Sequence, residues 1–186
     1  MIPLSVPSLK GNELKYVTKC IKTEWISSSG KFVKTFEDKV SSYLGAKHAI
    51  ACINGTSALQ VSLRILGVSP NDEVIVPTIT FVAPVNAIIY NNAKPIFMDC
   101  DEFFNIDVNK TIEFIKKNTI FKKKHSYNKK TKKRISAIIP VHVWGNAVDL
   151  EKLLLICKKR NIAILEDASE SFGTKYINGK IKNKYT

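Results

Sequence analysis

The chain has 186 residues, of which 45% are hydrophobic, so length and composition favour one globular domain with a sizeable core and argue against disorder. No apolar run approaches a membrane span, and the first residues lack the charged start and apolar core of a signal peptide. We therefore expect a cytoplasmic protein without a membrane partner. The four cysteines form no CxxC pair and no metal site is predicted. Cys52 and Cys157 lie in apolar patterns and are predicted to be small core residues.

The net charge of +13 is concentrated in one segment. Residues 116–134 contain ten lysine or arginine residues and no acidic residue, which leaves 19 basic and 16 acidic residues elsewhere. Such a run is usually solvated, and this one lacks the interleaved aromatics of a platform for stacking bases. We interpret it as a basic insertion at about 118–134 in a nearly neutral protein, and nucleic acid is not an expected partner.

Two helices and then an alternation of strand and helix are predicted along the chain. Apolar residues at helical spacing predict helices over 13–22 and 32–44, with Gly45 ending the second. The later strands are predicted at 48–53, 73–77, 95–99, 135–141 and 162–165, and the later helices at 56–67, 80–91, 108–117 and 148–160. The strands are continuous apolar runs, which is typical of a parallel sheet covered on both faces. The order predicts an α/β fold with three αβα layers and a mostly parallel sheet.

Residues 50–59 are predicted to form a buried strand, a tight turn at Asn54–Gly55 and the first turn of a helix. Thr56 and Ser57 lie at that helix start, where backbone N–H groups, two hydroxyls and the positive end of the helix dipole converge. Gly55 lets the backbone approach a ligand closely. The segment predicts a phosphate site, and the alternative is that Thr56 or Ser57 only caps the helix.

Ligands of open parallel sheets collect at the carboxyl ends of the strands. Besides the Gly55 turn, residues 77–81 and 166–170 lie at such ends. An anion site, an aromatic ring and a carboxylate together suit pyridoxal phosphate (PLP), whose pyridine nitrogen stays protonated beside a carboxylate. We predict that Asp167 supplies the carboxylate and Phe81 the ring. The alternatives are a helix cap for Asp167 and core packing for Phe81.

The chain resembles the N-terminal part of the DegT/DnrJ/EryC1/StrS family, the PLP-dependent nucleotide-sugar aminotransferases of fold type I. The matching segments run in the family's order and are residues 54–59, 77–83, 86–88, 140–145 and 166–171. Residues 25–33 also resemble the family's substrate-side loop. The insertion before Ile135 and the run 141–149 look most like the branch that makes 4-amino-4,6-dideoxy sugars for bacillosamine- or legionaminic-acid-type glycans.

The resemblance implies roles for particular residues. The implied cofactor-binding set is Gly55, Thr56, Ser57, Phe81, Asp167 and Glu170. The hydroxyls at the helix start would hold the cofactor phosphate, the phenylalanine would stack on the cofactor ring, and the aspartate would pair with the pyridine nitrogen. Glu170 stands where the family places a polar residue near the cofactor's phenolic oxygen. Trp25, Ser28 and His142 are implied on the substrate side, and for His142 a structural role at the sheet end is an equal alternative.

The implied reaction is a two-stage transamination, in a homodimer, for surface glycan biosynthesis. Glutamate is the usual amine donor, and a nucleotide-linked 4-keto-6-deoxy sugar becomes the 4-amino sugar. In the family, the lysine that holds PLP as a Schiff base lies in a Ser-Phe-x-x-x-Lys-like segment some tens of residues after the Glu-Asp motif. This sequence contains no such segment. We therefore expect residues 1–186 to be the N-terminal part of the PLP-binding large domain, without the remainder of that domain or the C-terminal small domain, and inactive alone.

Two alternatives remain open from the sequence. Some members of the family carry histidine in place of the lysine and dehydrate sugars with the same cofactor. A non-catalytic protein that grips nucleic acid or another anionic partner through the basic insertion is the other alternative, and steeply salt-dependent DNA binding would support it.

Overall fold

The structure is a computed structural model that describes residues 2–3 and 6–177. Residues 178–186, which the predicted domain includes, lie outside the described part. The chain divides into two units, Met1–Ala51 and Cys52–Thr186. None of the helices described is long and apolar enough to cross a membrane. In the same residues, no three histidine, cysteine, aspartate or glutamate side chains are placed to share a metal ion.

The first unit consists of two helices and the loop between them. Helices α1 (Glu13–Lys22) and α2 (Lys31–Leu44) confirm the predicted pair, and Gly45 ends α2 at a φ of 64°. Tyr16 and Phe32 join the helices edge to face, with ring centroids 5.2 Å apart. In the loop, the Trp25 indole donates to the Ser29 carbonyl at 2.7 Å.

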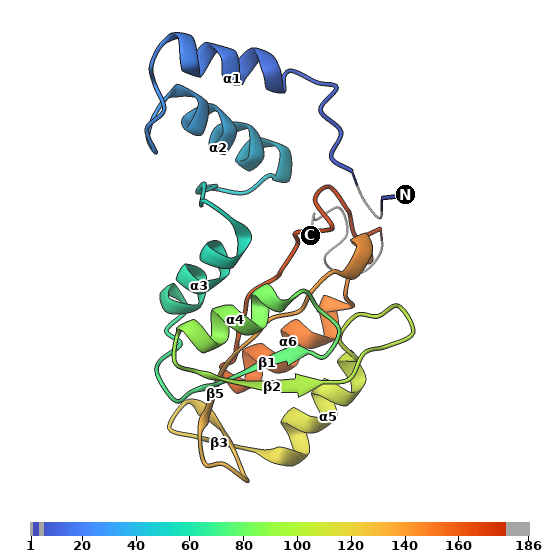
Figure 1. Ribbon diagram of the computed structural model, residues 1–186. Helices are drawn as coiled ribbons and strands as arrows, with labels where there is room; N and C mark the ends of the chain where they lie inside the picture. The colour runs from blue at the N-terminus through green and yellow to red at the C-terminus, as the bar shows by residue number, and fades with distance from the viewer. Residues whose placement is uncertain (1, 4–5, 178–186) are drawn as a thin grey trace. The chain divides into compact units, whose positions relative to one another are not determined.

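The second unit contains one mixed sheet (Figure 1). Its parallel part runs in the order β2, β1, β5 and β6. The bounds are Lys94–Met98 for β2, Glu73–Pro77 for β1, Arg134–Ile138 for β5 and Ala163–Ile164 for β6. The predicted α/β class is confirmed, and all four parallel strands were predicted close to these bounds. Parallel strands bring their carboxyl ends to one edge, which is where the candidate site lies.

Helices cover both faces of this sheet, which makes three layers. Helices α3 (Gly55–Ile65) and α4 (Val82–Tyr90) pack on one face, and α5 (Val108–Asn118) and α6 (Leu150–Arg160) on the other. Strand β1 shows why the strands read as continuous apolar runs: Val74 and Val76 enter the first core, Ile75 enters the second, and all three are 0% exposed. Cys157 lies in the second core, where burial raises the pKa of its thiol to about 12.

The predicted strand at 48–53 is wrong. These residues form no strand, and Ile50 and Ile53 are 79% and 91% exposed. A strand needs a neighbour to bind its backbone N–H and C=O groups, and within the described residues no strand pairs with this segment. One backbone contact is the Ala51 N–H, which donates to Glu37 Oε1 at 2.9 Å. Cys52 is exposed, so its predicted core position is also wrong.

The basic insertion is a β-hairpin that extends the sheet, where a solvated run was predicted. Strands β3 (Thr119–Lys122) and β4 (His125–Asn128) pair with each other, and β4 pairs antiparallel with β5. Buried polar groups anchor the hairpin, because Ser126 Oγ donates to the Arg160 carbonyl at 2.7 Å and Asn128 Nδ2 donates to Glu73 Oε2 at 2.8 Å. The lysine side chains of the hairpin remain exposed to solvent, which is why the composition of this segment resembles that of a loop.

The hairpin leads into an ion pair at the start of β5. Arg134 binds both carboxylate oxygens of the buried Asp72, with Nε 3.0 Å from Oδ1, and also donates to the Gly67 carbonyl at 2.7 Å. The hydrogen bond to Asp72 raises the pKa of the guanidinium, against the opposing effect of desolvation. One basic residue of the insertion is therefore committed to holding β1 and β5 together.

Candidate functional site

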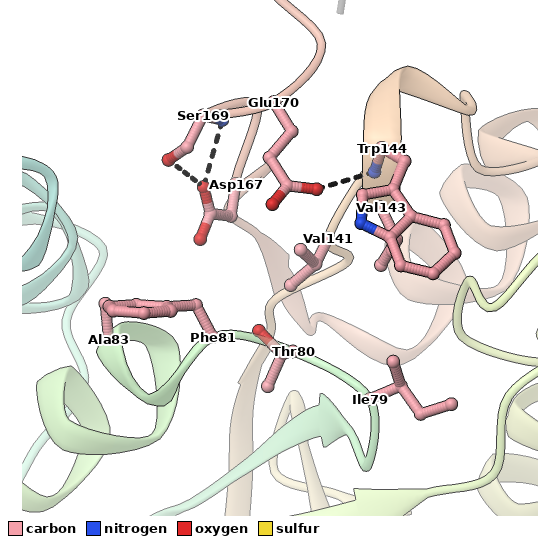
Figure 2. Close-up of a pocket in the computed structure, with 10 residues that line it drawn as sticks. All are labelled: Ile79, Thr80, Phe81, Ala83, Val141, Val143, Trp144, Asp167, Ser169 and Glu170. Carbon is pink, nitrogen blue, oxygen red and sulfur yellow. Dashed lines mark hydrogen bonds between the residues drawn. The ribbon is translucent and has the colours of Figure 1, made fainter. Parts of the chain in front are cut away.

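A pocket of about 340 Å³ lies at the carboxyl ends of the parallel strands (Figure 2). Three segments far apart in sequence supply its lining, one after β1, one after β5 and one after β6. The lining residues are Ile79, Thr80, Phe81, Ala83, Val141, Val143, Trp144, Asp167, Ser169 and Glu170. Apolar walls with a few polar groups are typical of small-molecule sites. The structure thus brings three predicted residues, Phe81, Asp167 and Glu170, to one pocket.

Asp167 continues the line of β6 and is fixed by backbone and side-chain bonds. Its N–H donates to the Pro140 carbonyl at 2.9 Å, and its carbonyl accepts from the His142 N–H at 3.1 Å. Its Oδ1 accepts from the Ser169 N–H at 3.1 Å and from Ser169 Oγ at 2.5 Å. Both side-chain bonds end on Oδ1, so Oδ2 is the oxygen available to a ligand. Asp167 as a residue is 7% exposed, and low dielectric strengthens any ion pair that its carboxylate makes there.

Phe81 is the N-cap residue of α4 and is 76% exposed. The alternative of core packing is therefore wrong. The ring lies along the pocket beside Ala83, and the Asp167 carboxylate points toward the same hollow (Figure 2). Next to it, Thr80 Oγ1 is buried and has no hydrogen-bond partner among the described residues. An exposed ring, a carboxylate oxygen and an unsatisfied hydroxyl at one hollow fit a flat heteroaromatic ligand.

Helix α3 begins at Gly55, and Asn54 caps it by accepting the Ser57 N–H at 2.8 Å. The alternative in which Thr56 or Ser57 caps the helix is wrong. An added Cβ at Gly55 would lie 3.7 Å from Ser169 Oγ, so the helix start is close to the Asp167–Ser169 turn. The Gly55, Thr56 and Ser57 residues do not line the pocket themselves. Gly55 lies beside Ser169, which does line the pocket.

His142 is 0% exposed, and both ring nitrogens are engaged. Its Nδ1 accepts the Val148 N–H at 3.0 Å, which places the ring hydrogen on Nε2, where it donates to Glu166 Oε2 at 3.1 Å. The expected substrate contact is therefore corrected: the structure gives His142 the structural role, tying the end of β5 to the start of α6 and to the strand-end carboxylate Glu166.

We expect His142→Leu to lower the free energy of unfolding by about 2–3 kcal/mol, because the buried Val148 N–H loses its acceptor and Glu166 loses its donor. Urea denaturation followed by far-UV circular dichroism measures the change. His48→Leu, at an exposed histidine, is the matched control and should change the value by less than about 0.5 kcal/mol. Equal losses in the two variants would contradict the structural role.

Two further residues, Trp144 and Asn105, belong to this site: from the sequence Trp144 was expected only to shape the sheet end, and Asn105 was assigned no role. Trp144 lies in the Val143–Gly145 turn that follows β5, and its N–H donates to Glu170 Oε2 at 2.6 Å. Asn105 is 2% exposed and holds the same turn, since its Oδ1 accepts the Val143 N–H at 3.0 Å. Neither bond has a sequence signal, because each joins residues more than 20 positions apart.

Trp25 and Ser28 belong to the first unit, and their predicted place on the substrate side stays a prediction. Trp25 is 59% exposed and packs against Gly30, where an added Cβ would come within 2.3 Å of the indole nitrogen. The loop geometry therefore depends on a residue without a side chain at position 30.

A three-layer α/β domain with an aromatic ring, a carboxylate and a helix N-terminus at one sheet edge defines a cofactor-binding domain. Residues 7–184 match the DegT/DnrJ/EryC1/StrS aminotransferase family. Two curated relatives are named GDP-perosamine synthase. The one from Caulobacter vibrioides is 39% identical over 176 residues, and the one from Escherichia coli O157:H7 is 40% identical over 185. The matches cover 94% and 99% of this chain. This chain belongs to the DegT/DnrJ/EryC1/StrS aminotransferase family.

Solved structures agree with this assignment. A DegT DnrJ EryC1 StrS aminotransferase from Brucella abortus is 32% identical with a TM-score of 0.79, covering 92% of this chain and 43% of that one. The E. coli GDP-4-keto-6-deoxy-D-mannose-3-dehydratase is 23% identical with a TM-score of 0.77, covering 95% of this chain and 43% of that one, and shares the fold. The chain spans 43% and 45% of the lengths of the two curated relatives, which is less than half.

Proposed function

We propose that this chain provides the cofactor-binding part of a PLP-dependent nucleotide-sugar aminotransferase. The observation that carries the proposal is the meeting of the Asp167 carboxylate and the exposed Phe81 ring at one pocket, with the N-terminus of α3 close by. Family membership supports it. A sugar aminotransferase structure from Streptococcus pneumoniae, 28% identical with a TM-score of 0.70, is described as the pyridoxamine phosphate (PMP) form.

Each residue of the site has a defined task in this proposal. PLP supplies an electron-accepting pyridine ring when it is bound. Asp167 Oδ2 holds a proton on the pyridine nitrogen, and Phe81 stacks on the ring. The backbone N–H groups and hydroxyls at Gly55, Thr56 and Ser57 bind the phosphate at the positive end of α3. Ser169 orients Asp167 through two hydrogen bonds to Oδ1.

Glu170 has a more constrained position than the sequence suggested. Its Oε2 is occupied by the Trp144 N–H, which leaves Oε1 for a hydrogen bond near the cofactor's phenolic oxygen. The proposed substrate is a nucleotide-linked 4-keto-6-deoxy sugar, with glutamate as amine donor and surface glycan as the destination. The two relatives named GDP-perosamine synthase support a nucleotide sugar. We further propose a cytoplasmic homodimer, in which Trp25 and Ser28 lie on the substrate side.

Titration with PMP tests the proposal on the chain itself. PMP carries an amine, so it cannot form imines with the chain's many lysines, and binding must be non-covalent. We expect saturable binding, followed by the circular dichroism of the bound chromophore, and binding of pyridoxamine without phosphate at least about tenfold weaker, because the α3 contacts are lost. Absence of saturable PMP binding would contradict the cofactor site. Equal affinity for the two compounds would contradict the phosphate position.

The 186 residues contain no Ser-Phe-x-x-x-Lys-like segment, which is where the family places the lysine that holds PLP as a Schiff base. We propose that the chain binds PMP but does not transaminate a keto sugar unaided. A dehydratase would use the same Asp167 and Phe81 contacts, so PMP binding alone does not separate the two activities. The basic-binder alternative gains no support from Ser126 and Asn128 of the hairpin, which bind within the fold, and it rests on the exposed lysines alone.

A further inference from the structure

Trp144 presents an exposed indole at the pocket from a backbone conformation that a bulky residue rarely adopts. Its φ and ψ are 52° and 28°, in the left-handed region, and the residue is 72% exposed. For a residue with a large side chain, positive φ is an outlier, and such outliers gather at functional sites. Phe104, itself at a φ of 65°, packs edge to face against the indole with ring centroids 5.2 Å apart.

Bonds from two sides hold this turn. Asn105 spans it, because its Oδ1 accepts the Val143 N–H at 3.0 Å and its Nδ2 donates to the Asn146 carbonyl at 3.1 Å. From the segment after β6, Glu170 accepts the Trp144 N–H and Thr174 Oγ1 donates to the Gly145 carbonyl at 3.1 Å. Four hydrogen bonds thus hold the backbone of the turn, and Phe104 packs against the exposed indole that it carries. A ring presented from a held backbone needs little reorganisation to bind a ligand.

The pocket has two exposed aromatic rings with different neighbours. In Figure 2 the Phe81 ring lies below the Asp167 carboxylate, whereas the Trp144 ring stands beyond Glu170. The ten lining residues include two carboxylates and no lysine or arginine, which disfavours a diphosphate next to the indole. The C–H face of a hexose is uncharged and packs well on an aromatic face.

We propose that Trp144, supported by Phe104, is the surface on which the hexose ring of the nucleotide sugar stacks, and that Asn105 is the residue that positions it. This inference rests on the proposed function, because it assumes that Phe81 and Asp167 are used by the cofactor. It makes Trp144 a contact of the sugar ring and leaves the nucleotide to be bound elsewhere.

The test uses the parent chain and Trp144→Phe, which both keep Trp25, so that the difference between their emission spectra gives the signal of Trp144. This difference is followed during titration with GDP-mannose and UDP-N-acetylglucosamine, and with GDP and UDP as the matched nucleotides, each with and without PMP. We expect the two nucleotide-hexoses to change the emission saturably and the nucleotides alone to leave it unchanged. An equal change with GDP or UDP would overturn the proposal in favour of base stacking, and no change with any probe would also overturn it.

Variants separate stacking from a merely structural effect. Calorimetric titration should show nucleotide-hexose binding about fivefold weaker in Trp144→Ala and nearly restored in Trp144→Phe, because an aromatic face is retained. Asn105→Ala should reduce the near-UV circular dichroism of Trp144, taken as the difference from the same chain with Trp144→Phe, and leave the far-UV spectrum unchanged. Asn118→Ala, at an exposed asparagine, should change neither. Unchanged affinity in Trp144→Ala would overturn the stacking role, and an unchanged Trp144 signal in Asn105→Ala would overturn the positioning role.

The same samples distinguish failure of this inference from failure of the proposed function. If PMP binds and no hexose changes the Trp144 emission, the inference alone is overturned. If the hexose changes the emission and PMP does not bind, the proposed cofactor site is overturned. The contact between Trp144 and the sugar is then still supported.

Discussion

Replacing Asp167 by asparagine is expected to weaken PMP binding about 10- to 100-fold. The carboxylate would bind the protonated pyridine nitrogen through a charge-assisted hydrogen bond, and such bonds contribute about 1.5–3 kcal/mol. Asparagine keeps an oxygen for the two bonds that Oδ1 accepts from Ser169, so the turn itself should persist. The affinity is measured by PMP titration with the dichroism signal described above.

The control for this variant is Glu113→Gln, which removes a carboxylate that pairs with Lys117 on the outer side of α5. That change should leave PMP affinity within about twofold of the parent chain, because the pair is exposed and far from the pocket in the fold. Equal affinity of the parent chain and Asp167→Asn would rule out the assigned role of Asp167. An equal loss in both variants would show that net charge is responsible and not this carboxylate.

Leu153→Ala is expected to lower the free energy of unfolding by about 3–4 kcal/mol. Leu153 is 0% exposed in the core between the sheet and helices α5 and α6, and a leucine deleted from such a position leaves a cavity as well as losing apolar burial. This loss is a large fraction of the stability of a typical domain. Urea denaturation measures it from the shift of the transition midpoint.

Leu155 offers a matched control on the same helix. It is 52% exposed, so Leu155→Ala should cost less than about 1 kcal/mol, and the small gain in helix propensity from leucine to alanine is the same in both variants. Similar losses in the two variants would mean that Leu153 does not face the sheet. That result would contradict the orientation of α6 in the structure. Leu153 does not line the pocket. Leu153→Ala should therefore leave the PMP affinity of the folded chain nearly unchanged.

The secondary structure followed largely from local patterns. Helices α1, α2, α5 and α6 and the parallel strands were predictable because apolar residues repeat with the helical period or run continuously through strands buried on both faces. The candidate residues Phe81 and Asp167 were also found from the sequence, since the order of strands and helices places both at the carboxyl ends of parallel strands. Family membership followed from the segments around them.

Tertiary contacts decided the rest. The segment 48–53 has the composition of a strand, but strand formation depends on a neighbour, which no local pattern specifies. The basic hairpin is held by Ser126 and Asn128, whose partners lie 34 and 55 positions away along the chain.

Some features of this protein were determined by the sequence, and others, mainly the roles of individual polar side chains, were decided by the tertiary structure. By itself the sequence determined the class of fold, the family and the sheet edge at which the candidate site lies, because these depend on periodicity and on short motifs. The structural role of His142, the Asn54 cap and the turn that presents Trp144 were decided by the folded chain alone. A buried polar group takes whichever partner the packing brings within hydrogen-bond distance, and that partner is set by three-dimensional proximity.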